Sequence, residues 1–470
     1  MRTILKIRYV LLLCFGIAAS ASPARLEMKA DAASCMYRCG TPATITLRGI
    51  DLPENAKTIT CTVYVNGKKA EEKNISANEQ YTVTRSLDKP GWLAVVGTVR
   101  DADGNVLPEP NPLSARDRQF RAGIGVLFEP EKIKAASECP EDFEAFWNAR
   151  KADLSKVPMK VTRTEVKVPE RFKDRTRCYD VRIACAGDMP VSGYLSIPLN
   201  AKPKTMPLVL ALDGAGVRGA WLPAWRRHEI RFCINPHGIE NGRDSAYYGN
   251  LEKTTLRGYR LKGAGDRETW YFKNMILRAL RALEFVKTIP EWDGKNLIVV
   301  GESMGGGQAI AAAALDHDVT LCQAGIPAWG DFNGPASGYP APEKGAYNTY
   351  FDIANFAKFV KCPILLSAGL IDFTCSPYSI FCAYNALPEG TAKEIRLYPE
   401  YGHTGRCRTY PVDFLQLRKP FPNPSGKIVP VPPQKKKRQP ERPAVSPSAT
   451  GRSSSTSGTL WRNCVSAAGV

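Results

Sequence analysis

The sequence lacks the features that mark several large protein classes. Only four of its 470 residues are histidines, and Cys35 and Cys39 have no second ligand pair at zinc-finger spacing. After residue 21 no apolar run approaches the ~20 residues that cross a bilayer. Basic residues do not alternate with aromatic ones, as they do in proteins that bind single-stranded nucleic acid. We therefore expect no metal or other cofactor, no membrane span and no nucleic-acid partner.

The composition that remains is that of a soluble globular protein. Hydrophobic residues make up 44% and charged residues 23% of the chain, close to ordinary averages, and the length suggests about two or three domains. The formal net charge is +18, but residues 427–470 hold eight Lys or Arg and one acid, so +7 of it is local. Because residues 421–470 are rich in Pro, Ser and basic residues, we expect them to form a disordered tail.

Residues 1–21 have the pattern of a secretory signal peptide. Three basic residues lie among the first eight, residues 9–19 are largely apolar, and Ala19-Ser20-Ala21 resembles a cleavage site. The apolar run is too short for a membrane anchor. The pattern predicts a secreted or periplasmic protein, and the fourteen cysteines fit such a compartment.

Residues 22–130 contain short runs that favour strands. These runs are rich in Thr, Val, Ile and Tyr, and Asn66-Gly67 and Asp103-Gly104 are hairpin signals between them. The even spacing predicts a small β-sandwich of immunoglobulin type. No catalytic constellation falls in this region, so we expect an accessory or spacer domain. The expected strands are 43–47, 58–65, 80–86 and 92–100.

Residues 135–420 alternate between strand and helix patterns. Apolar strands separated by amphipathic helices imply a mostly parallel sheet with helices on both faces, an α/β fold. An antiparallel pair, 178–186 with 191–198, precedes the alternation. The other expected strands are 207–213, 230–235, 296–301, 363–369 and 395–398. The expected helices are 139–155, 269–287, 305–316 and 377–387.

The motif with the clearest chemistry is Gly301-Glu302-Ser303-Met304-Gly305. It follows a buried strand directly and opens an alanine-rich helix, which is the setting of a nucleophile elbow. The turn is so tight that side chains at positions 301 and 305 would clash. It lifts the Ser303 hydroxyl out of the sheet at a helix N-terminus. A phosphate-binding loop is the alternative, but the lysine of that motif is absent.

A serine nucleophile needs a base, and position along the chain selects one histidine. In α/β-hydrolases the order is serine, acid, histidine. His228 and His237 precede Ser303, and His317 follows the elbow helix too closely to fold back over it. The remaining histidine, His403, lies in a loop after a predicted strand and is the expected base.

The acid of the triad should leave the end of the strand before His403. Asp372 is the only carboxylate that follows strand 363–369 there, and it would orient and stabilise the imidazole. Asp352 and Glu389 are alternatives that leave no predicted strand. The side chain of Glu302 is expected to point outward from the elbow.

Two backbone N–H groups are candidates for the oxyanion hole. One belongs to Met304, directly after the nucleophile. The other belongs to Ala215, because Asp213-Gly214-Ala215-Gly216 follows an earlier strand and is rich enough in glycine to present its amides.

These motifs resemble the acetyl xylan esterase and cephalosporin-C deacetylase family of carbohydrate esterases, which have the α/β-hydrolase fold. The likeness covers most of 139–405 and includes a subgroup with an extra N-terminal β-domain. It implies removal of acetyl groups from acetylated oligo- or polysaccharides, with Ser303, Asp372 and His403 as the triad. The matching stretches are 140–147, 234–242, 271–283, 290–293, 305–315, 369–372 and 401–403.

The chain departs from the family pattern at two places. The family usually has Gly-Gly-Ser-Gln-Gly-Gly at the elbow, where this chain has Glu302 and Met304. It usually has His-Gly-Tyr at the oxyanion loop, where this chain has Asp213-Gly214-Ala215. The tyrosine lines the acyl pocket in the family, so its loss bears on the range of acyl groups. His237, in a loop, either contacts substrate or supports structure.

Three functions are consistent with these patterns. The first is a secreted serine esterase that deacetylates carbohydrates through an acyl-enzyme. The second is a peptidase of the prolyl-oligopeptidase kind, although about ninety residues before the hydrolase region are too few for its propeller. The third is a non-catalytic carbohydrate-binding protein. The oligomeric state and the particular sugar cannot be derived from the sequence.

Overall fold

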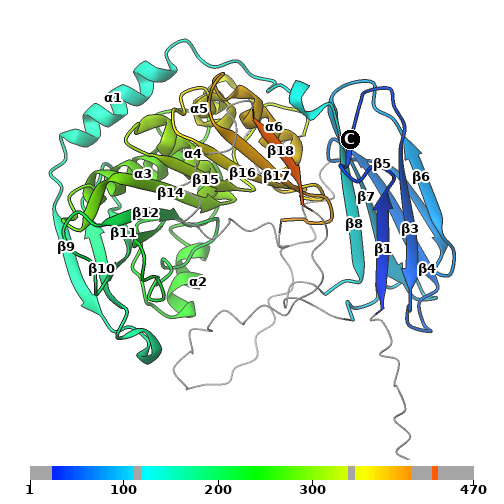
Figure 1. Ribbon diagram of the computed structural model, residues 1–470, viewed down its shortest axis with the longest axis horizontal. Coiled ribbons are helices and arrows are strands. Elements are labelled where there is room, and N and C mark those ends of the chain that lie inside the picture. The colour runs from blue at the N-terminus through cyan, green and yellow to red at the C-terminus, as the bar shows by residue number, and fades with distance from the viewer. Residues whose placement is uncertain (1–23, 111–117, 337–343, 404–425, 432–470) are drawn as a thin grey trace, which may run out of the picture.

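The strands of the computed structural model form three sheets, and Figure 1 shows them in two units. The structure describes residues 24–110, 118–336, 344–403 and 426–431. The predicted signal peptide, 1–21, lies outside these ranges. Across them, no helix is long and apolar enough to cross a membrane.

The N-terminal unit consists of two facing sheets. Its strands are β1 Arg25–Ala30, β2 Met36–Tyr37, β3 Ala43–Ile50, β4 Thr58–Val65, β5 Lys68–Ser76, β6 Tyr81–Arg85, β7 Gly91–Arg100 and β8 Arg121–Phe128. One sheet has the order β1-β3-β6 and the other β2-β8-β7-β4-β5. A side chain on Gly97 of β7 would meet Leu26 and Leu47 of the first sheet. Two facing β-sheets are therefore established, and immunoglobulin-type topology stays a prediction.

The turn Asn66-Gly67 joins β4 and β5 as the sequence predicts. Both residues have positive φ angles, 48° and 81°, which asparagine and glycine tolerate best. The strands on either side are antiparallel, with Val65 opposite Lys68. Strand β5 was not expected, because most of its side chains are exposed and polar.

The second unit is built on a ten-stranded mixed sheet in the order β18-β17-β16-β15-β14-β12-β13-β11-β10-β9. The seven strands β12 to β18 are mutually parallel. Strands β11, β10 and β9 extend the sheet beyond β13, each antiparallel to the strand before it. This arrangement confirms the α/β-hydrolase class. The strands are β9 Val161–Val166, β10 Thr176–Ile183, β11 Val191–Pro198, β12 Met206–Leu212, β13 Ile230–Asn235, β14 Trp292–Glu302, β15 Leu321–Gly325, β16 Ile364–Gly369, β17 Lys393–Tyr398 and β18 Lys427–Pro430.

Helices pack on this sheet through apolar faces. In α3, Phe272, Ile276, Leu280 and Leu283 recur at helical spacing and are buried. The α-helices are α1 Phe143–Ser155, α2 Ser245–Lys253, α3 Tyr271–Val286, α4 Met304–Leu315, α5 Ile353–Ala357 and α6 Pro377–Ala386. Short 3-10 helices are η1 Pro130–Lys132, η2 Glu170–Phe172, η3 Tyr259–Leu261 and η4 Ala346–Phe351.

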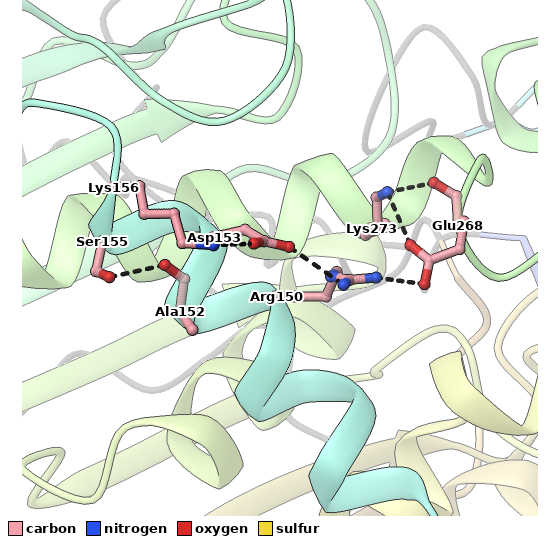
Figure 2. A network of polar contacts seen from close by, with 7 residues as sticks. All are labelled: Arg150, Ala152, Asp153, Ser155, Lys156, Glu268 and Lys273. Carbon is pink, nitrogen blue, oxygen red and sulfur yellow. Dashed lines mark hydrogen bonds and ion pairs between the residues drawn. The ribbon is translucent and has the colours of Figure 1, made fainter.

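Helix α1 follows the segment that joins the two units, and both of its faces contact the second unit (Figure 1). Its apolar side chains Phe143, Phe146 and Trp147 are buried. On its polar face, Arg150 contacts Asp153 and Glu268, and Glu268 also contacts Lys273 of α3 (Figure 2). The two carboxylates are about half exposed, Asp153 at 51% and Glu268 at 44%, so the ion pairs stabilise the helix less than its apolar face does.

Strand β18 corrects the predicted boundary at the C-terminal end. Residues 427–430, expected in a disordered tail beginning at 421, pair in parallel with β17 as the edge of the large sheet. The prediction is wrong for this strand, because Ile428 and Val429 gain a sheet partner that composition does not reveal. Residues 404–425 and 432–470 lie outside the described residues.

Eleven cysteines fall within the described ranges, and all of them are free thiols. Cys178 and Cys185, which lie at the start of β10 and just after its end, are both buried and unbridged. The described part of the fold therefore relies on apolar packing rather than on disulfides.

Candidate active site

Ser303 lies between β14 and α4 in a strained turn. Its φ angle is 56° with ψ −123°, a conformation that non-glycine residues rarely adopt. A Cβ on Gly301 would lie 2.1 Å from the Gly305 carbonyl oxygen, and one on Gly305 would lie 2.1 Å from the Leu212 carbonyl oxygen. Only glycine fits at both positions, which is the geometry that the motif predicted.

The structure brings Ser303, His403 and Asp372 together in a hydrogen-bonded chain. The Ser303 Oγ lies 3.1 Å from His403 Nε2, and His403 Nδ1 lies 2.9 Å from Asp372 Oδ2. Asp372 is fully buried, and its Oδ1 accepts from the N–H groups of Thr374 and Cys375 at 2.8 Å each. Oδ2 is therefore the oxygen of Asp372 that faces the imidazole of His403.

The surroundings of His403 favour its protonated form. Burial by itself lowers the pKa of His403, but the hydrogen bond and charge of Asp372, with a further contribution from the Glu302 carboxylate, raise the pKa above its ordinary value. A base whose conjugate acid is stabilised in this way accepts the serine proton more readily. Asp352, the alternative acid, instead accepts from the N–H groups of Asp331, Phe332 and Ala354.

The two expected oxyanion donors lie in segments that adjoin the nucleophile. Met304 is the first residue of α4, so its N–H has no acceptor within the helix. A Cβ on Gly214 would lie 3.1 Å from the Glu302 carbonyl oxygen and 3.9 Å from Ser303 Cβ. Ala215 follows directly, so the loop that carries its N–H passes beside the serine.

A serine elbow, a histidine, a buried aspartate and an adjoining glycine-rich loop make this a serine-hydrolase site on an α/β-hydrolase sheet. The acetyl xylan esterase (AXE1) family matches residues 126–335 and 343–416, more than half of the chain. The chain belongs to the acetyl xylan esterase family. It is accordingly a carboxylic ester hydrolase.

The chain is similar to a curated relative and to solved structures. Acetyl esterase Axe7A of Xylanibacter ruminicola is 30% identical over 342 residues, which cover 67% of this chain and 76% of that protein. Acetyl xylan esterase 1 of Thermoanaerobacterium sp. JW/SL YS485 is 23% identical, covers 62% of this chain and 96% of its own, and superposes with a TM-score of 0.50. The acetyl xylan esterase of Paenibacillus sp. R4 is 25% identical, with coverages of 59% and 94% and a TM-score of 0.49.

His237 contacts the loop that carries the expected oxyanion donor Ala215. It is fully buried, with Nδ1 2.9 Å from the Tyr271 hydroxyl and Nε2 3.2 Å from the Gly216 carbonyl oxygen. Burial, with nearby Arg278, lowers the pKa of His237 to about 3, so the ring is neutral. Of the two roles that the sequence left open, these contacts favour structural support, and substrate contact by His237 stays a prediction.

Tyr259 completes this network and was not found from the sequence. Its hydroxyl accepts from the Gly216 N–H at 3.3 Å and lies 3.9 Å from Met304 Sδ. One phenol thus contacts Met304, which is one expected donor, and Gly216, which adjoins the other donor, Ala215. A tyrosine at the start of a short 3-10 helix, far from both motifs, gave no signal in the sequence.

Cys375 also adjoins the triad without having been predicted. Its Sγ lies 3.9 Å from Ser303 Oγ, and burial raises the pKa of the thiol well above its ordinary value, so it stays protonated. Among the described residues, Asp372, Cys375 and His403 form the one group of side chains spaced to hold a metal ion. Asp372 and His403 already bond each other, and a protonated thiol is a poor ligand, so this group fits proton transfer better than metal binding.

Proposed function

We propose that this esterase removes acetyl groups from acetylated oligo- or polysaccharides, with Ser303 as nucleophile, His403 as general base and Asp372 as the residue that orients it. The observation that carries the proposal is the continuous chain from Ser303 Oγ to His403 to buried Asp372 in a member of this family. Family membership implies acetylated carbohydrates as substrates.

The reaction begins when His403 Nε2 takes the Ser303 proton as Oγ attacks the acetyl carbonyl carbon. The carbonyl oxygen becomes an oxyanion, which the N–H groups of Met304 and Ala215 stabilise in this proposal. His403 then gives its proton to the sugar oxygen as the ester bond breaks. The sugar leaves with a free hydroxyl, and the acetyl group stays on Ser303.

Water completes the cycle by the same proton path. His403 removes a proton from a water molecule, which attacks the acetyl carbon of the acyl-serine. Collapse of the second tetrahedral intermediate returns the proton to Ser303 Oγ and releases acetate. Asp372 keeps Nδ1 protonated throughout, so that Nε2 is the free base at each attack.

Secretion remains part of the proposal on the basis of residues 1–21 alone. Their basic start, apolar run and Ala19-Ser20-Ala21 are the support. N-terminal sequencing of protein recovered from the periplasm or medium of an expressing cell tests it. A mature chain beginning near Ser22 is expected, whereas an intact Met1 in the cytoplasm would contradict it.

Substrate preference is tested with esters of increasing size. We expect turnover of 4-nitrophenyl acetate and release of acetate from acetylated xylo-oligosaccharide, with poor turnover of the octanoate ester. Butyrate is the informative middle case, because Ala215 stands where the family usually has tyrosine. Preference for octanoate, or failure to deacetylate the oligosaccharide, would contradict the proposal. Cleavage of peptides instead would favour the prolyl-oligopeptidase alternative.

A further inference from the structure

Strand β7, at the centre of the five-stranded sheet of the N-terminal unit, is covered on both faces. Residues 91–97 of β7 are buried at every position, although a sheet with one face in water would alternate. Gly97 faces the three-stranded sheet, next to Leu26 and Leu47. Side chains alternate along a strand, so Trp92 points to the opposite face of the sheet. That face lies on the second unit, which carries Ser303, Asp372 and His403 and is called the hydrolase unit below. In Figure 1, β8 of this sheet is on the hydrolase side.

The segment that this face covers is the loop of the catalytic acid. Trp92 is fully buried, and its Nε1–H donates to the Leu370 carbonyl oxygen at 2.7 Å. The ring of Phe373 packs on those of Trp92 and Tyr64, with centroids 5.4 Å and 4.6 Å apart. Leu370 and Phe373 flank Asp372, so the N-terminal sheet holds the acid loop on both sides of the carboxylate.

Two glycines in β8 let this loop come close. A Cβ on Gly125 would lie 2.0 Å from the Leu370 carbonyl oxygen, and one on Gly123 would lie 3.1 Å from the Ile371 side chain. No other residue fits at 125 without displacing the Leu370 backbone.

The same strand also contacts the segment that leads to the base. The N–H of Gly125 donates to the Pro399 carbonyl oxygen at 2.9 Å. Within the hydrolase unit, the N–H of Ile371 donates to the Tyr401 carbonyl oxygen at 3.1 Å, which ties the acid loop to the chain just before His403. One strand of the N-terminal unit therefore contacts the supports of both Asp372 and His403.

We propose that the N-terminal β unit supports the catalytic centre by fixing loop 370–373. By holding this loop, the unit sets the distance between Asp372 and His403. Trp92 and Gly125 are positioning residues in this arrangement. The inference rests on the proposed function of the triad and replaces the spacer role expected from the sequence. If the loop shifts, the hydrogen bond from His403 to Asp372 weakens, which slows catalysis and lowers the pKa of His403.

Two substitutions in the full-length protein test the proposal against a matched control. Trp92→Phe keeps the ring against Phe373 and removes the donor to Leu370. Gly125→Ala places a methyl group against the Leu370 backbone. Gly97→Ala is the control, because it adds the same methyl group to the same sheet but toward flexible leucine side chains on the other face. Far-UV circular dichroism and thermal melting verify that each variant is folded.

The readouts are the pH profile of kcat for 4-nitrophenyl acetate and the rate of Ser303 labelling by a fluorophosphonate. For Trp92→Phe and Gly125→Ala we expect losses on the order of tenfold to a hundredfold in kcat, since small displacements of reacting groups cost this much. KM should change little. The acid limb of the profile, where kcat falls as His403 becomes protonated, should move to lower pH. Gly97→Ala should match the wild type in both readouts.

Folded Trp92→Phe with wild-type kcat and acid limb would overturn the proposal. So would loss of activity with an unmoved acid limb, or an equal loss in Gly97→Ala. If Gly125→Ala does not fold, Trp92→Phe decides. Wild-type release of acetate from acetylated xylo-oligosaccharide tests the proposed function separately, because labelling of Ser303 does not depend on which sugar is the substrate.

Discussion

The two sides of Ser303 are supported in different ways. On the oxyanion side, buried His237 and Tyr259 and partly buried Tyr271 form a network within the hydrolase unit. On the acid side, the loop of Asp372 rests on Trp92 and other residues more than two hundred positions earlier in the chain. The oxyanion side is thus self-contained, whereas the acid side depends on a second unit.

The difference predicts that changes on the two sides have different kinetic signatures. Disturbing the oxyanion side weakens transition-state stabilisation and leaves the base unchanged. Disturbing the acid side alters the pKa of His403 as well as the rate, because Asp372 is what raises that pKa. The acid limb of the pH profile therefore separates the two kinds of support.

The largest effect on kcat is expected at Ser303, which lies between the oxyanion side and the acid side. Ser303→Ala removes the nucleophile and should reduce kcat by about a million-fold, as loss of a triad serine does elsewhere. The fold should persist, because the hydroxyl contributes little packing. Acetate release measured against an uncatalysed blank checks this, and a residual rate within about tenfold of the wild type would remove Ser303 from the nucleophile role.

Tyr259→Phe weakens the oxyanion side alone. It removes the hydroxyl that accepts from the Gly216 N–H and lies against Met304. We expect kcat to fall about tenfold, less than the roughly hundredfold or greater loss when an oxyanion donor itself is removed. The acid limb should stay in place. An acid limb that moves as it does in Trp92→Phe would erase the distinction between the two sides.

Glu302→Gln tests the electrostatic part of the base's environment. The Glu302 carboxylate helps to raise the pKa of His403, so neutralising it should lower that pKa. His403 then stays neutral to lower pH, and the acid limb of kcat/KM moves to lower pH with its plateau nearly unchanged. Salt should reduce the shift if the carboxylate acts through solvent. A limb that moves to higher pH would contradict the assignment.

Asp213→Asn tests how a buried carboxyl group on the oxyanion side affects the free energy of unfolding. Burial raises the pKa of Asp213 to about 7, and its Oδ2 is one of the buried polar atoms without a partner among the described residues. Between about pH 4 and this value the folded protein keeps a proton that the unfolded chain releases, so the free energy of unfolding falls as pH rises.

Asp213→Asn should remove this decrease in the free energy of unfolding with rising pH. Thermal melting of Asp213→Asn and wild type at pH 5 and pH 8 checks it. The variant should be relatively more stable at pH 8, by up to about 4 kcal/mol, since one pKa unit corresponds to about 1.4 kcal/mol. An equal difference at both pH values would show that Asp213 is ionised throughout.

The residues of the candidate triad could be selected from the sequence because each carries a local signal. Ser303 stands in a glycine-bracketed turn, Asp372 follows the end of an apolar strand, and His403 is the one histidine after both. These signals depend on the α/β alternation, which determines where strand ends meet. Seven of the ten strands described in the large sheet followed from the same pattern, whereas β9, β15 and β18 were not expected.

What the sequence did not reveal depends on partners far along the chain. Burial of His237 requires the Gly216 carbonyl and the Tyr271 hydroxyl, and β18 is a strand only because β17 lies beside it. The apolar run after Trp92 signals burial on both faces of a strand but does not say what covers the second face. Short polar strands such as β5 have too little apolar pattern to be recognised.

The central claim is that Ser303 is the residue through which this protein deacetylates carbohydrate. Its most direct test is to titrate the wild-type enzyme with a fluorophosphonate, locate the label by tandem mass spectrometry, and measure acetate release from acetylated xylo-oligosaccharide in the same samples. The account predicts a single modified peptide containing Ser303 and a loss of acetate release in proportion to the labelled fraction. Undiminished acetate release from fully labelled enzyme, or a label on another residue that abolishes it, would contradict the account.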